Sequence, residues 1–536
     1  MEMEETTPLL LGDEAQRRQR APIPGSFLQA RSVRSICLVI ALFSFLLSVS
    51  GAVSDVPTTR LIEDHICRSY YNEQSSPPAD IDEAMCKVDE VQSRMVFLNG
   101  WISMIQGTLE LLVAFPYGIY ADRNGRKTVL RLSLLGVILQ SVYGWGVLAM
   151  GQAVSINLLL ASPLLVLAGG GGTVLVSTMY SIISDVADEA SRVNAFLSLL
   201  VGGTMGDLVG LLLASRLMLS SPWLPIGLSL VVIALAAGTM VFIPETLPPR
   251  KRSPDSDMYD DGSPLAAVGS HARELRDQLA TAARMLRQPS LCLVLFAFLC
   301  PVPVGMATST LFVQYVSKRF GWSMASVGYL LSVKTVVNIL VIAVAIPGLS
   351  RLLMSGALVR SLSVRDKDKI LAQASAFALV IGFALLAAGS SIGVVVAGLI
   401  VKTLGGGLSS LCRSLATAHT TPDNTAKLQT VIGIITTVGM LVAAPTLAFL
   451  FSLGMRLGGV MIGLPYAAMT FYLAVTAFAL CFVRTAAPED ADALPEAYSL
   501  QEVVMCDSAS IRSFQSHNSM SSGILLRRSR ASSHSA

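Results

Sequence analysis

The sequence predicts an all-α integral membrane protein with twelve transmembrane helices arranged as two six-helix bundles. Of its 536 residues, 53% are hydrophobic and only 14% are charged, and the mean hydropathy is +0.62. A helix that crosses the hydrocarbon layer needs about 20 mostly apolar residues. Apolar windows of that length recur along the chain, so the lipid bilayer is the expected solvent for most of it.

The expected spans fall into two groups of six. They cover residues 34–54, 96–117, 129–150, 156–183, 194–215 and 223–243 in the first bundle (34–243), and 291–314, 325–347, 370–389, 392–415, 430–453 and 460–482 in the second bundle (291–483). Residues 1–33 and 484–536 are polar and are expected to be disordered tails. Residues 55–95 are expected to form a solvated outer loop, and residues 244–290 a linker between the bundles.

Basic residues predict the orientation of the chain. Arginines precede the first span and follow the last: Arg17, Arg18, Arg20, Arg31 and Arg34 before it, and Arg484, Arg512, Arg527, Arg528 and Arg530 after it. Because Lys and Arg concentrate in cytoplasmic segments, both termini are expected in the cytoplasm. The net charge of +3 does not indicate nucleic-acid binding, and we expect no nucleic-acid partner.

A short motif in the N-terminal tail bears on which membrane holds the protein. Glu5, Leu9 and Leu10 have the spacing of an acidic dileucine sorting signal. Such a signal would direct the protein to a vacuole or another endomembrane. The alternative is a chance match, which leaves the plasma membrane open.

Seven of the eight cysteines fall into two groups. Five fall in apolar spans, where buried thiols serve as small packing residues. Cys67 and Cys86 share the expected outer loop, where an oxidising compartment allows a disulfide. The alternative is a pair of free thiols.

Four ionisable residues lie near the middle of expected spans: Glu110, Asp207, Lys334 and Lys402. A charged side chain there costs about 2.5 to 3.5 kcal/mol on insertion scales, so each one needs a reason. The two acids lie in the first half of the chain and the two bases in the second. We expect them to face a central cavity as proton or substrate sites. Static ion pairs across the interface are the alternative.

Polar residues also form a stripe on the second span. Asn99, Ser103, Gln106 and Glu110 recur at helical spacing and therefore share one face. That face cannot point at lipid, so we expect it to line the bundle interior or a watery cavity. Asn338, one helical turn from Lys334, is a further candidate for proton or substrate contact.

Small residues recur every four positions on the fifth span, at Gly202, Gly206 and Gly210. This spacing is typical of helices that approach each other closely. Asp207 stands inside the same pattern and is therefore a candidate coupling site. Elsewhere the sequence has no phosphate-binding loop, metal-spaced His/Cys cluster or nucleophile elbow, so we expect neither an enzyme nor a metal or cofactor.

The turn between the second and third spans has the sequence GIYADRNGRK, from Gly118 to Lys127. It closely resembles the signature of the major facilitator superfamily. The resemblance implies two six-helix bundles that rock around a central site. It also implies an inner gate, latched when the cavity faces outward, that comprises Gly118, Asp122, Arg123, Gly125, Arg126 and Lys127.

Two further segments resemble parts of this superfamily. The glycine-rich fifth span is similar to its antiporter motif, except that Asp207 replaces the usual proline. The segments HICRSYY and AMCKVDEVQ, which contain Cys67 and Cys86, are similar to fungal members related to the proton-coupled folate transporter group.

These observations predict a secondary active transporter that moves a small organic solute by alternating access and is coupled to protons. We expect it to act as a monomer in the bilayer. One alternative is a drug/proton antiporter, which the glycine pattern favours and Asp207 disfavours. The other is a transporter-like sensor that binds solute without net flux.

Overall fold

The structure is a computed structural model that describes residues 29–30, 32–73, 81–187, 189–246, 289–341, 344, 348, 364–417 and 425–483. Within these ranges the side chains of Asp122 and Arg123 are not described. The sorting motif (Glu5, Leu9 and Leu10), most of both expected tails and nearly all of the expected linker lie outside the described residues.

The described part of the first bundle contains seven α-helices. They are α2 (Val33–Asn72), α3 (Asp89–Asn124), α4 (Arg126–Ala149), α5 (Val166–Gly169), α6 (Gly171–Val186), α7 (Glu189–Met218) and α8 (Trp223–Thr239). The short 3-10 helices η1 (Glu83–Lys87), η2 (Gly151–Ala153) and η3 (Ile156–Leu165) connect or extend them. Gly170 (φ 82°) and Gly171 (φ 71°) bend the chain between α5 and α6.

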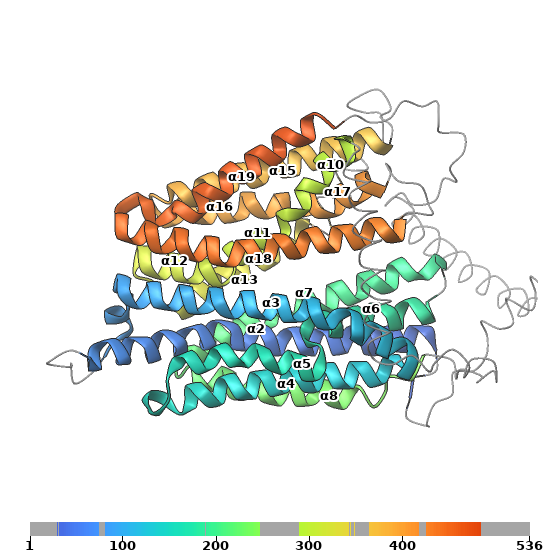
Figure 1. Ribbon diagram of the computed structural model, residues 1–536, viewed down its shortest axis with the longest axis horizontal. Coiled ribbons are helices and arrows are strands. Elements are labelled where there is room, and N and C mark those ends of the chain that lie inside the picture. The colour runs from blue at the N-terminus through green and yellow to red at the C-terminus, as the bar shows by residue number, and fades with distance from the viewer. Residues whose placement is uncertain are drawn as a thin grey trace, which may run out of the picture.

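The second bundle is likewise helical. Its described α-helices are α10 (Pro289–Phe296), α11 (Pro301–Ala307), α12 (Thr310–Phe320), α13 (Met324–Leu340), α15 (Val364–Ala388), α16 (Ile392–Leu404), α17 (Leu408–Thr417), α18 (Thr425–Leu457) and α19 (Leu464–Cys481). Three 3-10 helices, η5 (Ala297–Leu299), η7 (Gly405–Gly407) and η9 (Gly459–Gly463), join them. None of the described residues belongs to a strand. Figure 1 shows the blue-to-green first bundle below the yellow-to-red second bundle.

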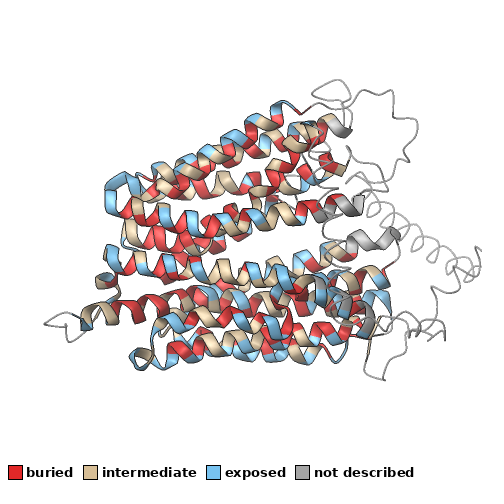
Figure 2. Ribbon diagram, viewed as in Figure 1, coloured by how far each residue is buried: buried red, intermediate tan, exposed pale blue. Residues whose placement is uncertain are grey.

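The expected spans correspond to apolar helices. Ten helical segments of the described chain are long and apolar enough to cross a bilayer, and Trp223–Thr239 and Met324–Leu340 are shorter apolar helices. Large apolar side chains such as Leu235, Phe471 and Phe478 are exposed on the helices, and exposed positions alternate with buried ones along their length (Figure 2). Because lipid is as apolar as these side chains, this exposure suits a protein embedded in a bilayer.

Close helix contacts hold the first bundle together. The predicted glycine stripe of α7 lies against α2: a Cβ on Gly202 would lie 2.6 Å from the carbonyl oxygen of Ala41, and one on Gly206 would collide with that of Phe45. The second bundle is centred on α15, which packs against α16, α17 and α19.

The first helix is longer than its sequence predicts. Residues 55–72 continue α2 rather than belonging to the outer loop expected over 55–95. Asp55, Thr58 and Thr59 fall in that expected loop. They lie instead at helical spacing on the face that lines a cavity between the bundles, where polar side chains are tolerated.

The two bundles are in contact at one end of the molecule. We call the end with Cys67 and Cys86 the disulfide end, and the opposite end, where Gly125 separates α3 from α4, the Gly125 end. The most extensive contacts between the bundles join α3 to α18 and α7 to α13. At the disulfide end Ser93 hydrogen-bonds Ser452 across the bundles at 2.5 Å.

Candidate functional site

A cavity of about 810 Å³ lies between the two bundles. Its volume is in the range of sites that hold small molecules. Helices α2, α3, α4, η3 and α7 line it from the first bundle, and α11, α12, α13 and α18 from the second. The charged and amide side chains of this lining are Asp55, Asn99, Gln106, Gln140, Asp207, Gln314 and Lys334.

Three charged residues on different helices form one part of the wall. Asp55 on α2, Asp207 on α7 and Lys334 on α13 interact electrostatically with one another. Ser48, also on α2, hydrogen-bonds the side chain of Asp207. The structure therefore brings the predicted candidates Asp207 and Lys334 to one cavity, on the walls of different bundles.

Asp55 is a member of this group that reasoning from the sequence missed. Its side chain is exposed, although it lies deep between the bundles, because it faces the cavity. The sequence contained a signal: Ser48, Asp55, Thr59 and Ile62 continue the helical spacing of the first span.

Only part of the polar stripe of α3 lines the cavity, and the rest belongs to a series of side-chain hydrogen bonds beside it. Asn99, Ser103 and Gln106 line the cavity, but Glu110, one turn beyond Gln106, does not. Gln140 Nε2 donates to Gln106 Oε1 at 3.1 Å, and Gln106 Nε2 donates to Glu110 Oε1 at 3.1 Å.

Glu110 ends this series of hydrogen bonds by contacting a third helix, α6. The hydroxyl of Thr173 on α6 donates to Glu110 Oε2. A Cβ on Gly171 would lie 3.2 Å from Glu110 Oε1, so the backbone bend before α6 packs closely against this carboxylate. Glu110 thus joins α3 to α6, next to the cavity rather than in its wall.

Lys402 lies behind the cavity wall. Its Nζ donates to Thr308 Oγ1 at 3.1 Å, and Lys334 Nζ donates to the carbonyl oxygen of the same residue at 3.3 Å. Asn338 is close to η7, since a Cβ on Gly406 would lie 3.4 Å from Asn338 Oδ1. Neither Lys402 nor Asn338 belongs to the lining of the cavity.

Two amide side chains of the lining have buried atoms without a hydrogen-bond partner among the described residues. They are Nδ2 of Asn99 on α3 and Oε1 of Gln314 on α12. A buried polar group without a partner is destabilising by about 1 to 3 kcal/mol. Because both atoms are buried, a solute in the cavity can pair with them only after these side chains reorient.

The charged turn at the Gly125 end is held within the first bundle. Gly125 has φ 102°, which favours glycine. Glu245 accepts from the backbone N–H groups of Arg126 at 2.9 Å and Lys127 at 3.1 Å, and so caps the N-terminus of α4. Arg126 Nε lies 3.4 Å from Asp185 Oδ2.

Lys127 extends the same arrangement by donating to the carbonyl oxygen of Ile243. Asp185, Ile243 and Glu245, which contact Arg126 or Lys127, all precede the second bundle. Gly118 is exposed, and a Cβ there would meet no atom within 4 Å. The Asp122 and Arg123 side chains of the expected gate lie outside the description.

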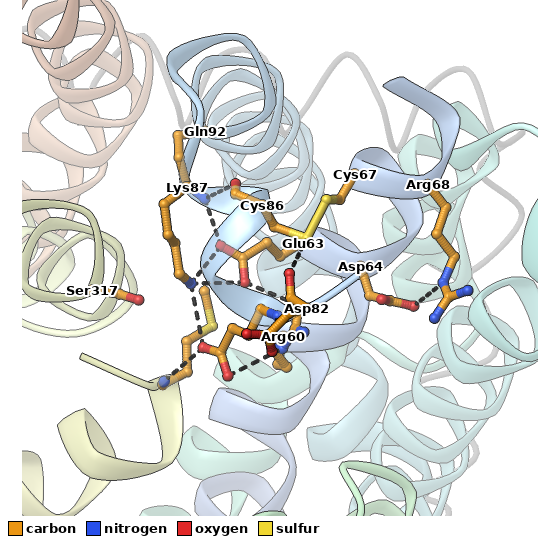
Figure 3. A network of polar contacts seen from close by, with 12 residues as sticks. Arg60, Glu63, Asp64, Cys67, Arg68, Asp82, Cys86, Lys87, Gln92 and Ser317 are labelled. Carbon is orange, nitrogen blue, oxygen red and sulfur yellow. Dashed lines mark hydrogen bonds and ion pairs between the residues drawn. A yellow bond between two sulfur atoms is a disulfide. The ribbon is translucent and has the colours of Figure 1, made fainter. Parts of the chain in front are cut away.

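The predicted disulfide is present between Cys67 on α2 and Cys86 in η1, with their Cα atoms 5.3 Å apart. It lies beside an ionic network around Glu63, whose side chain is fully buried (Figure 3). Lys87 Nζ lies 2.7 Å from Glu63 Oε1, and Gln92 Nε2 donates to the same oxygen at 2.5 Å.

Two helical bundles around a polar, partly charged cavity define a multi-pass membrane protein of the carrier class. The sequence model described as Major Facilitator Superfamily matches residues 95–445. The chain belongs to the Major Facilitator Superfamily, as the turn from Gly118 to Lys127 had indicated.

Similar fungal proteins cover most of the chain. The MFS efflux pump atnC of Emericella nidulans is 29% identical over 450 residues, 83% of this chain and 86% of that protein. The efflux pump ustT of Aspergillus flavus is 27% identical over 469 residues, 84% and 89% of the two chains. The relation to the folate transporter group stays a prediction.

Solved structures share the fold. The D-xylose-proton symporter has a TM-score of 0.56 at 13% identity, covering 84% of this chain and 98% of that one. The human organic anion transporter MFSD10 has a TM-score of 0.51 at 19% identity, covering 84% and 100%. At these identities the likeness concerns the fold alone.

Proposed function

We propose that the protein is a secondary active transporter that moves a small organic solute through the cavity between its bundles by alternating access. The observation that carries the proposal is the placement of Asp55, Asp207 and Lys334 in one cavity wall formed by both bundles. A site shared by two bundles changes its access when they rock against each other, which is the basis of alternating access in such folds.

Proton coupling is the second part of the proposal. Asp55 and Asp207 share one base, Lys334, as their described electrostatic partner, so a proton on one carboxylate removes an excess negative charge from the cavity. Glu110 is the other candidate, because the chain through Gln106 and Gln140 connects it to the cavity wall. The amide side chains of Asn99 and Gln314, which line the cavity, are the proposed hydrogen-bonding contacts of the solute once they turn toward it.

The orientation follows from the basic residues of the tails. Both termini are proposed to lie in the cytoplasm, on the side of the Gly125 end, in the plasma membrane or an endomembrane. In that orientation, contacts at the disulfide end close the cavity to the outside. The conformation is therefore proposed to be closed to the outside, and the turn from Gly118 to Lys127 is proposed as a gate whose latch belongs to the outward-facing state.

The names of two relatives support one direction of transport. Both atnC and ustT are called efflux pumps. Export against a concentration gradient, driven by an inward proton gradient, makes the protein an antiporter. This is the second candidate. The resemblance of the glycine-rich α7 to the antiporter motif favours it, and Asp207 in place of the usual proline disfavours it.

Solute identity and flux can be tested together. Metabolites retained by cells with and without the protein would be compared without preselection, and the solute that differs would be offered to vesicles containing the purified protein. Net accumulation under an imposed pH gradient is the expected result. Binding of the solute with no net flux would favour a sensor and overturn the proposal.

A further inference from the structure

A short segment at the disulfide end touches both bundles. We call it the η1 strap (Glu83–Lys87). It follows α2 in the chain and precedes α3, so it belongs to the first bundle. The Glu83 side chain nevertheless reaches the first residue of α13, in the second bundle. The strap therefore lies where the two bundles separate if the cavity opens at this end.

The strap is fixed to α2 by a covalent bond and by a buried carboxylate. The Cys67–Cys86 disulfide joins the two. Glu63 on α2, fully buried, accepts from Lys87 Nζ at 2.7 and 2.9 Å. Gln92 Nε2 donates both to Glu63 and to the carbonyl oxygen of Cys86, the latter at 3.0 Å (Figure 3). These bonds lie within the first bundle and persist when it moves as a rigid body.

Two charged contacts join the strap and the start of α3 to the second bundle. Glu83 Oε1 accepts from the backbone N–H of Met324 at 3.0 Å, at the N-terminus of α13, where the helix dipole favours a negative charge. Lys318, in the last turn of α12, lies 2.6 Å from Asp89 Oδ1 and donates to the carbonyl oxygen of Lys87. Each contact pairs a charge of one bundle with a group of the other.

We propose that Glu83 and Lys318 are the gate residues of the disulfide end, and that Glu63 and the Cys67–Cys86 bond position the η1 strap for them. Both contacts exist only while the bundles are together, so they stabilise the state that is closed at this end. A bond made in one state and absent in the other shifts the equilibrium between the two. This inference rests on the proposed alternating access.

The strap is bonded more strongly to α2 than to the second bundle. Bonds from the strap to α2 are many and include a covalent one, whereas its charged bonds to the second bundle are few. The strap therefore stays with the first bundle, and the break occurs at Met324 and Lys318. Glu90 supplies a matched comparison: it lies next to Asp89, is 62% exposed and pairs with Arg94 of its own helix at 3.9 Å.

The test measures the distance between the bundles at this end. Spin labels would be attached through unnatural amino acids at Asn72 and Val460, which are exposed positions of the first and second bundles. Full-length protein in lipid nanodiscs would be compared with Glu83→Ala, Lys318→Met, Lys318→Arg and Glu90→Ala by pulsed electron paramagnetic resonance. No solute is needed.

Glu83→Ala and Lys318→Met are expected to raise the ratio of long to short label distances about fivefold, the effect of losing a modest coupling. Lys318→Arg and Glu90→Ala are expected to keep the distribution of the unmodified protein. An unchanged distribution in both Glu83→Ala and Lys318→Met would overturn the proposal, as would an equal shift in Glu90→Ala.

A variant that does not fold, and a protein that does not transport solute, can each be distinguished from a failure of the proposed gate. If a variant does not elute as a single species, amide hydrogen exchange of residues 321–330 in the other gate variant supplies the second measurement, with faster exchange expected. The distances do not depend on flux. A gate that opens as expected in a protein that moves no solute would contradict the proposed function and leave the gate intact.

Discussion

Lys334 and Lys402 donate hydrogen bonds to the same residue, Thr308, through its carbonyl oxygen and its hydroxyl respectively. Two ammonium groups that share one neutral partner need compensating acids, because buried like charges destabilise each other. Asp207 and Asp55 interact with Lys334. The two lysines therefore have different roles: Lys334 faces the cavity, and Lys402 holds the wall behind it.

Replacing each lysine separately tests this division. Lys334→Met removes the single basic side chain of the described cavity lining and leaves Asp55 and Asp207 without their base. We expect the transport rate to fall about tenfold or more, because an uncompensated charge disfavours one of the two states. Lys402→Met is expected to have a smaller effect. Initial rates in vesicles at equal protein content measure both, and equal losses would contradict the assignment.

Glu110 is expected to act in coupling rather than in solute binding. Glu110→Gln keeps the shape and the hydrogen bond from Gln106 but cannot bind and release a proton. We therefore expect loss of pH-driven accumulation with exchange of labelled for unlabelled solute retained. Accumulation equal to that of the unmodified protein would remove Glu110 from the mechanism.

Two glycines of the signature segment, Gly118 within α3 and Gly125 at the turn after it, are expected to differ in their effect on stability. Gly125 has φ 102° and lies against Glu245, so Gly125→Ala introduces backbone strain of about 1 to 3 kcal/mol and disturbs the cap of α4. Gly118→Ala meets open space. Thermal unfolding of the purified protein should show a lower midpoint for Gly125→Ala only, and similar midpoints would argue against the capping role of Glu245.

A second glycine pair tests the contact between α7 and α2. A Cβ on Gly206 would collide with the carbonyl oxygen of Phe45, whereas one on Gly227 in α8 meets no atom within 4 Å. Gly206→Ala is expected to destabilise the first bundle by about 1 to 3 kcal/mol, and Gly227→Ala to leave it unchanged or slightly more stable. The midpoint of thermal unfolding distinguishes them, and a larger loss in Gly227→Ala would contradict the packing.

Periodicity and motif spacing predicted the architecture because membrane helices must satisfy their backbone internally. The apolar windows therefore marked the helices, and the family signature at Gly118 to Lys127 placed a turn between two of them. The pairing of Cys67 with Cys86 followed from their shared position outside the spans.

The site was harder to predict because it depends on contacts between distant segments. Asp55 was assigned to a loop since polar residues usually end a span. Only the three-dimensional arrangement shows that these residues face a cavity, where helix α2 continues. Likewise Glu110 and Lys402 lie beside the cavity rather than in its lining. Residue spacing in the sequence does not distinguish these two locations.

The account rests on one claim: that solute bound beside Asp55, Asp207 and Lys334 crosses the membrane with proton coupling. The direct measurement is solute accumulation by vesicles containing the purified protein under an imposed pH gradient, with Asp207→Asn as the comparison. The account predicts accumulation by the unmodified protein, and solute binding without accumulation by Asp207→Asn. Equal accumulation by both proteins, or binding without flux by the unmodified one, would contradict it.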